Sequence, residues 1–115
     1  MNVRAILIGA GLYLLGQMLT YYQLNGQFLW ESFKKNPWLV SLLGLPISYI
    51  FIVATTYAVD GFGGQMWPNR FMGFATGILV YALGTSYYFN QPIDLKTFVS
   101  LALAVLLICI QVFWK

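Results

Sequence analysis

The stretch from Leu95 to Trp114 reads LKTFVSLALAVLLICIQVFW, and it decides the fold class. Its length matches the roughly 20 residues that an α-helix needs to cross about 30 Å of hydrocarbon. It has no strict alternation of apolar and polar residues, which a membrane-spanning strand would show. The stretch therefore predicts a transmembrane helix.

Three further apolar windows precede this one. They cover residues 5–24, 38–59 and 71–89, and each is again long enough to span a bilayer as a helix. In lipid the backbone must satisfy its own hydrogen bonds, so an open-ended segment has to be helical. We therefore expect an all-α integral membrane protein, with residues 1–115 forming a single bundle of four transmembrane helices.

The composition of the chain points the same way. Of its 115 residues, 60% are hydrophobic and only 8% are charged, whereas a soluble domain has about 25% charged residues. So few charges cannot cover a globule in water. The first window follows Arg4 as in a signal peptide, but no small-residue cleavage motif ends it, so we expect it to remain as the first span.

The same composition limits the chemistry. The chain has no histidine, and its one cysteine, Cys109, lies inside an apolar run. No carboxylate pair lies at depth, so we expect no enzyme, no catalytic residue, no metal site and no cofactor. The net charge of +3 includes no basic run longer than Lys34-Lys35, which argues against a nucleic-acid partner. Membrane lipids are the expected surroundings.

The basic residues do not indicate an orientation. Four spans would put Arg4, Arg70 and Lys115 on the side of the N-terminus, and Lys34, Lys35 and Lys96 on the opposite side. Because the positive-inside rule reads the difference between the two sides, a tie predicts neither direction. The chain either inserts both ways and pairs antiparallel, or its direction is fixed by folding or by a partner. An even number of spans places both termini on the same side.

The joints between the windows carry helix signals. Asn36 and Asp94 are expected to cap the helices that follow them. The longest joint, residues 27–36, has Trp30 and Phe33 at helical spacing. It is either an interfacial segment that lies flat among the lipid headgroups or a polar loop.

Small residues mark where helix backbones can approach one another. The candidate packing positions are Gly9, Gly16, Gly73, Gly77 and Gly84. Gly73 and Gly77 form a GxxxG motif, which we interpret as packing inside the protomer, with self-association as the alternative. The window 95–114 is almost wholly aliphatic and is expected to be an outer helix that faces lipid or a second copy.

Pro46 falls midway in the second window and is the expected helix kink. A proline there frees the carbonyl of Leu42 from its usual bond, and Ser41 or Ser48 is expected to take that bond. The kink is either a tolerated distortion or the place where a transporter helix flexes.

No Asp, Glu, Lys or Arg lies deep inside a window, so the usual mark of a proton or ion path is missing. Amides, hydroxyls and aromatic rings would therefore have to bind any cargo. The candidate substrate chamber consists of Tyr13, Gln17, Tyr81 and Thr85. Gln17 is the costliest of these to bury, and it either bonds a neighbouring helix or contacts a cargo.

The glycine-rich third window leads into YFNQPIDL at residues 88–95 and then into the aliphatic last window. This pattern resembles the small four-helix branch of the drug/metabolite transporter superfamily, which includes the small multidrug resistance proteins. The resemblance implies a dimer, here a homodimer, in a bacterial inner membrane. Multidrug members have a first-helix glutamate; this chain has Gly16-Gln17 in that stretch, which is more similar to the lipid-flippase-like members that move lipid-linked sugars.

Two functions follow as expectations. The first is a small carrier that moves or holds an amphipathic small molecule or a lipid-linked compound. The second is a non-catalytic accessory or scaffold subunit of a larger membrane complex, which would use the same glycine and tyrosine stripes as protein contacts.

Overall fold

The computed structural model describes residues 1–114, so Lys115 of the charge comparison lies outside the described residues. Four long helices form the architecture: α1 (Val3–Asn25), α4 (Gly44–Gly61), α5 (Met66–Tyr88) and α6 (Leu95–Phe113). Short pieces join α1 to α4: the 3₁₀ turn η1 (Gly26–Phe28), α2 (Glu31–Lys35) and α3 (Pro37–Ser41). No strand occurs in the described chain, which confirms the all-α class.

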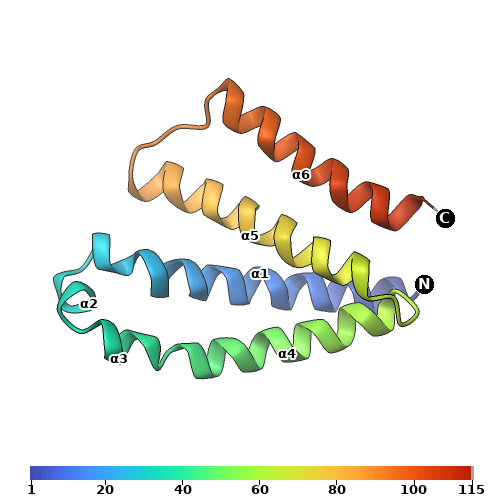
Figure 1. Cartoon of the computed structure of the whole chain (residues 1–115), viewed down its shortest axis with the longest axis horizontal. Helices are drawn as coiled ribbons and strands as arrows, with labels where there is room; N and C mark the ends of the chain where they lie inside the picture. The colour runs from blue at the N-terminus through green and yellow to red at the C-terminus, as the bar shows by residue number, and fades with distance from the viewer. Residues whose placement is uncertain (115) are drawn as a thin grey trace.

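The four long helices lie side by side in a flat array of 48 × 36 × 18 Å (Figure 1). Helix α1 packs most extensively against α4 and also contacts α5, and α5 in turn contacts α6. The start of α1 and the end of α6 lie at the same end of the array (Figure 1). The order across the array is therefore α4, α1, α5, α6.

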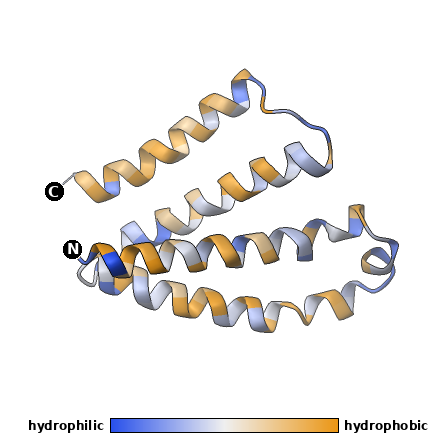
Figure 2. Ribbon diagram, turned by 180° about the vertical axis from the view of Figure 1, so that it is seen from behind, coloured by the Kyte–Doolittle hydropathy of each residue, from blue (hydrophilic) through white to orange (hydrophobic). Residues whose placement is uncertain are grey.

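Three helical segments are long and apolar enough to cross a membrane. They are Val3–Phe28, Pro37–Gly61 and Leu95–Phe113. Helix α5 has the length, at 23 residues, but it is less apolar and is not among them. Figure 2 shows the contrast between the nearly continuous hydrophobic ribbon of α6 and the mixed one of α5. A membrane protein is thus supported by three helices, and a fourth crossing through α5 remains a prediction.

The second window is a broken helix. Helix α3 ends at Ser41 and α4 begins at Gly44, so Pro46 lies in the first turn of α4, where its missing N–H leaves no helical bond unmade. The carbonyl of Leu42 accepts a hydrogen bond from the N–H of Leu45 at 3.2 Å. This backbone bond takes the place of the hydrogen bond that was expected from the hydroxyl of Ser41 or Ser48. The break therefore lies at Leu42 and Leu43, one turn before Pro46.

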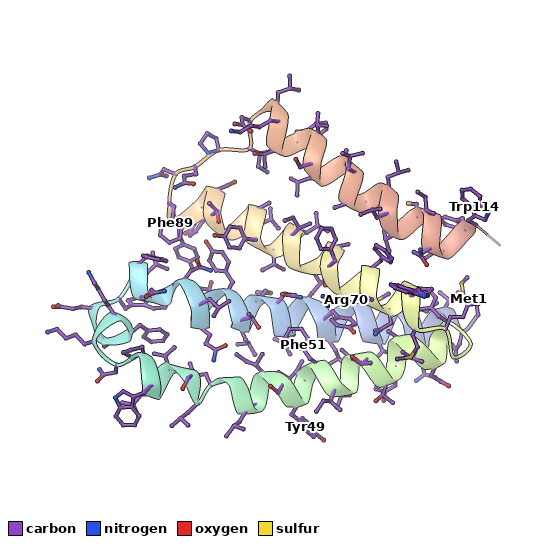
Figure 3. All side chains as sticks on the ribbon, viewed as in Figure 1. Met1, Tyr49, Phe51, Arg70, Phe89 and Trp114 are labelled. Atoms are coloured by element: carbon purple, nitrogen blue, oxygen red, sulfur yellow. The ribbon has the colours of Figure 1, made fainter. Side chains whose placement is uncertain are left out.

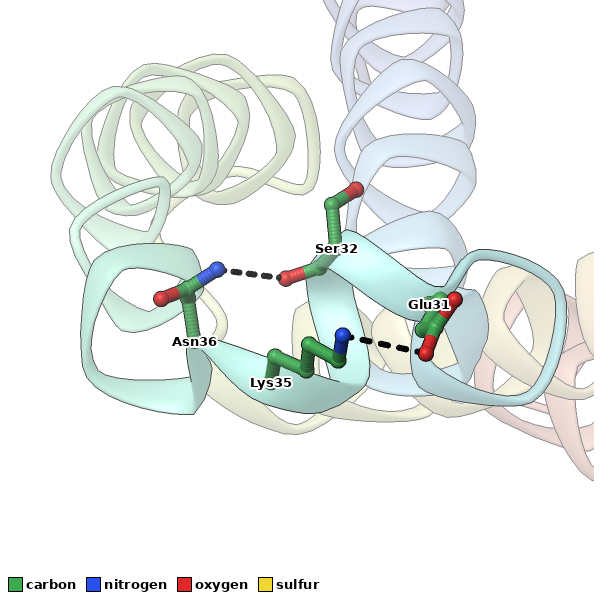
Figure 4. A network of polar contacts seen from close by, with 4 residues as sticks. All are labelled: Glu31, Ser32, Lys35 and Asn36. Atoms are coloured by element: carbon green, nitrogen blue, oxygen red, sulfur yellow. Dashed lines mark hydrogen bonds and ion pairs between the residues drawn. The ribbon is translucent and has the colours of Figure 1, made fainter.

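The two expected caps differ in outcome. Asp94 accepts a hydrogen bond from the N–H of Thr97 at 2.9 Å and caps α6. Asn36 makes no capping bond; its Nδ2 donates back to the carbonyl of Ser32 at 3.0 Å (Figure 4). Asn36 thus occupies the predicted N-cap position of α3 but does not make the capping bond, because its side chain turns toward the helix before it.

The joint of residues 27–36 is not one helix. It divides into the end of η1 and the short helix α2, with an exposed ion pair of 3.1 Å between Lys35 and Glu31 (Figure 4). The Trp30 and Phe33 rings lie together, with centroids 5.1 Å apart. The joint is thus partly helical, and it packs its aromatic residues against each other.

The best-packed part of the molecule is the seam between α1 and α4. Ala54 and Ala58 are both 0% exposed, because Gly9 of α1 lets the two backbones meet there. Tyr13 and Met72 complete this core from α1 and α5. In contrast, α6 has a single buried residue, Ala104, so it is the outermost helix of the protomer.

Candidate functional site

A cavity of about 690 Å³ lies between α1, α4 and α5. Of the four residues predicted to form a chamber, Tyr13, Gln17 and Tyr81 line it. Thr85 does not line it; its hydroxyl oxygen lies 3.2 Å from that of Tyr21, which does. Three of the four predicted residues thus line one cavity, and Thr85 lies outside it, next to Tyr21.

The glycines of α5 allow the side chains of α1 to pack closely against α5. A Cβ added to Gly77 would lie 3.1 Å from the amide of Gln17, and one added to Gly84 would lie 2.7 Å from the Tyr21 ring. At Gly73 the nearest atom, in the Tyr13 ring, would be 3.4 Å away. These contacts lie within one protomer. The glycine stripe therefore provides the surface on which the polar side chains of α1 rest.

A second pair of close approaches holds α1 against α4. A Cβ on Gly16 would lie 2.9 Å from the Phe51 ring, and one on Gly9 would lie 3.0 Å from the backbone nitrogen of Ala58. The Phe51 side chain lies between α4 and α1, whereas Tyr49 points away from α1 (Figure 3). Phe51 therefore forms part of the cavity wall opposite α5.

One end of the cavity is a hydrogen-bonded polar cluster. The hydroxyl of Tyr13 donates to Oδ1 of Asn69 at 2.5 Å and lies 3.0 Å from the Thr55 hydroxyl. Gln17 is one turn further along α1, and its Nε2 donates to the carbonyl of Gly73 at 3.1 Å. Asn69 is only 9% exposed. The cluster ties α1 to both α4 and α5 and presents polar side chains to the cavity.

Arg70 also lines the cavity, next to this cluster. No Asp or Glu is among the lining residues, and the ion pair between Lys35 and Glu31 is the one ion pair within residues 1–114. Asp60 instead borders a separate hollow near the turn between α4 and α5. The cavity therefore has one cationic side chain and no anionic one.

Further along the cavity, the hydroxyl oxygen of Thr20 is buried without a hydrogen-bond partner in the described chain. Thr20 lies between Gln17 and Tyr21 on α1 and lines the cavity. The lining also includes Ile78 and Val80 of α5.

Sequence reasoning did not identify Asn69, Arg70 or Thr55 as lining residues. For Asn69 and Arg70 the reason is a boundary: the third window was expected to begin at residue 71, whereas α5 begins at Met66. Thr55 lies inside the second window, so this boundary does not account for it. Asn69 precedes Gly73 by four residues and so lies on the same helix face. That spacing is the signal that would have found it.

The polar groups of this site can bind and orient a molecule. The described residues contain no group of three His, Cys, Asp or Glu that could hold a metal ion. Amides, hydroxyls and one guanidinium lie among apolar and aromatic side chains in the lining, an arrangement typical of binding sites for small molecules.

Comparison with known proteins adds no relative: no family model, no curated protein and no solved structure matches the chain.

Proposed function

We propose that the chain is a small membrane carrier that binds an amphipathic small molecule or lipid-linked compound in the cavity between α1, α4 and α5. The observation that carries this proposal is the cavity itself, about 690 Å³ in volume and lined by both rings and hydrogen-bonding groups. Ligand sites of drug-sized molecules have volumes of about 300–1,000 Å³ and the same mixture of apolar walls and few polar groups.

In this proposal α5 is the fourth span. Its 23 residues correspond to about 34 Å of helix, enough to cross the hydrocarbon layer. Two of its polar residues, Asn69 and Thr76, are buried in the protomer and would not meet lipid. The hydroxyl of Thr76 bonds to the carbonyl of Met72 at 2.9 Å, which lowers its cost in a membrane.

The resemblance to the small four-helix drug/metabolite transporters supports the same function, with Gly16-Gln17 as in the flippase-like members. A homodimer and a bacterial inner membrane belong to this proposal through that resemblance. The cavity lining contains no carboxylate, so we do not propose that a carboxylate couples transport to protons.

The test compares two glutamine variants. Gln17→Leu removes an amide that lines the cavity, and Gln23→Leu removes an amide of α1 that bonds the carbonyl of Val40 at 3.2 Å but lies outside the lining. Proteoliposomes would be assayed for uptake of three amphipathic dyes: one neutral, one anionic and one cationic. We expect the wild type and Gln23→Leu to carry at least one dye and Gln17→Leu to lose it while still folding. Equal uptake by both variants, or none by the wild type, would contradict the proposal.

The accessory-subunit function is the second candidate, and the outer helix favours it. In α6 only Ala104 is buried, and most of the large apolar side chains are exposed in the protomer. Purification in mild detergent separates the two functions. An accessory subunit should co-purify with an unrelated chain in fixed ratio, whereas a self-sufficient carrier should not.

A further inference from the structure

We propose that the cavity is selective for amphipaths with an anionic head group, and that Arg70 is the counter-ion of that group. This inference rests on the proposed carrier function and adds the chemical class of the ligand. The ligand head would be a carboxylate, sulfonate or phosphate, and its apolar body would extend along α5 toward Tyr81.

The charge at the cavity lining is positive. Arg70 is the one ionisable side chain other than tyrosine among the residues that line the cavity. No carboxylate is close enough to pair with any basic residue except Lys35 in the described chain, so the charge of Arg70 is available to a ligand. Arg70 is exposed at the cavity, so it repels a like charge with the strength expected near a protein surface. A cation near Arg70 is therefore disfavoured in spite of the aromatic walls.

The polar groups at the Arg70 end of the cavity are hydrogen-bond donors. Asn69 adjoins Arg70 and is 9% exposed, and its Oδ1 already accepts the bond from the Tyr13 hydroxyl. In the described structure Nδ2 of Asn69 donates to no protein group, and the residue lines the cavity. This end of the cavity thus offers an amide N–H and a guanidinium, both of which are donors. An oxyanion is the ligand group that accepts from both.

The cavity is elongated along α5. Phe74 and Ile78 follow Arg70 at intervals of four residues, so the three lie along one face of α5. Tyr81 lies eleven residues beyond Arg70, which corresponds to about 16 Å of helix. On α5, apolar side chains therefore separate Arg70 from Tyr81, whereas Gln17 and Thr20 of α1 line the cavity between its ends. An elongated amphipath with one charged end matches this order.

The experiment uses three dansylated undecyl probes that differ only in the head group: the carboxylate, its neutral methyl ester and the corresponding amine. The full chain is held in nanodiscs of neutral phosphatidylcholine, and binding is followed by dansyl fluorescence. We expect the wild type to bind the carboxylate about tenfold or more tightly than the ester, and the amine most weakly. A tenfold difference is the effect expected of one charge-assisted contact.

The variants assign the preference to Arg70. Arg70→Gln should bind the carboxylate no better than the ester while keeping its affinity for the ester, and Arg70→Lys should retain part of the preference. Arg4→Gln is the matched control, because Arg4 is exposed at the same end of the array, near the start of α1, and does not line the cavity. If Arg70 were only an anchor at the headgroups, Arg4→Gln and Arg70→Gln would change the three affinities alike.

Two results would overturn the inference and distinguish it from the function it rests on. Equal binding of all three head groups by the wild type would refute the anion site but leave a carrier of neutral amphipaths standing. Absence of binding for every probe would refute both. If Arg70→Gln does not fold, binding of the carboxylate and ester probes by the wild type is measured at high salt instead. The preference for the carboxylate should then be lost, because salt screens an exposed ion pair.

A last arm decides the source of the anion. Phosphatidylglycerol is added to the nanodiscs, and its competition with the carboxylate probe is measured for the wild type and Arg70→Gln. Competition in the wild type alone assigns the site to an anionic lipid head group. Absence of competition, with the carboxylate preference intact, assigns it to a free amphipathic anion.

Discussion

Gly9 and Gly11 are two residues apart on α1, and their surroundings are opposite. A Cβ on Gly9 would lie 3.0 Å from the backbone nitrogen of Ala58 and 3.2 Å from the carbonyl oxygen of Ala54, whereas a Cβ on Gly11 would meet nothing within 4 Å. Backbone atoms cannot rotate away as a side chain does. The first glycine is therefore required by packing, and the second is not.

This difference makes a matched pair of variants. Gly9→Ala should lower the free energy of unfolding by about 1–3 kcal/mol, because the α1–α4 seam has to separate to admit a methyl group. Gly11→Ala should be neutral or stabilising by up to about 1 kcal/mol, since alanine is the better helix former. Reversible unfolding in mixed detergent micelles measures both. Equal effects would show that the seam is looser than described.

The Tyr13 hydroxyl is a second test at this scale. Tyr13→Phe keeps the ring and removes the group that donates to Asn69 and lies 3.0 Å from Thr55. We expect a loss of about 1 kcal/mol in stability, as for a hydrogen bond between membrane helices. A double-mutant cycle with Asn69→Leu isolates the pair. Additive single effects would mean that the two side chains do not interact.

At the residue scale, the sequence was informative where a polar residue stood out against an apolar window. Tyr13, Gln17 and Tyr81 were found in this way, and all three line the cavity. Asn69 and Arg70 were not found, because they stand at a helix start, where polar residues are ordinary. Asn69 is buried and Arg70 is exposed, and only the packing of α5 shows that both line the cavity.

At the scale of the elements, the helix capped by Asp94 offers a pH test. Hydrogen bonds from the side chain and the backbone N–H of Thr97 hold the pKa of Asp94 below its ordinary value. The cap is therefore fully effective at neutral pH, and its contribution is lost as the pH falls through the lowered pKa. Hydrogen exchange in the first turn of α6 should accelerate only below the usual range for aspartate.

The start of α1 provides the control for this pH test. Asn2 caps α1 by accepting the N–H of Ala5 at 3.2 Å, and an amide does not titrate in this range. Exchange at the start of α1 should follow only the intrinsic pH dependence. Asp94→Asn should remove the acid transition from α6. If that transition persists in the variant, the carboxylate is not its cause.

Helix boundaries followed from the sequence more closely than helix continuity did. The first and last windows, 5–24 and 95–114, lie within a few residues of α1 and α6. The interruption of the second window lies at Leu42 and Leu43, before α4 begins at Gly44, whereas the sequence indicated only Pro46 in the first turn of that helix. Local pattern therefore located the segments but not the interruption.

For the whole molecule, the balance of basic residues gives a test of orientation. Lys34 and Lys35 lie in α2, at the end of the array opposite the termini (Figure 1). Lys34→Gln with Lys35→Gln should shift the chain toward insertion with both termini in the cytoplasm, by the positive-inside rule. Reporters fused to the C-terminus measure the two populations.

Substitution of the same two lysines by arginine keeps the charge and serves as the control. The pair between Lys35 and Glu31 is exposed, so its loss should hardly affect stability. A topology that does not change in the glutamine variant would mean that folding or a partner fixes the direction.

The close seam of α1 and α4 has a mechanical consequence. With Ala54 and Ala58 fully enclosed against Gly9, these two helices form a rigid frame that cannot slide or part without losing its tightest contacts. Across the cavity, α5 leans on that frame through rings and amides, and Gly63 and Gly64 join it to α4 with left-handed φ angles of 70° and 86°. In the proposed carrier, α5 together with α6 would therefore be the part that moves relative to this frame when a ligand enters, with Gly63 and Gly64 as its hinge.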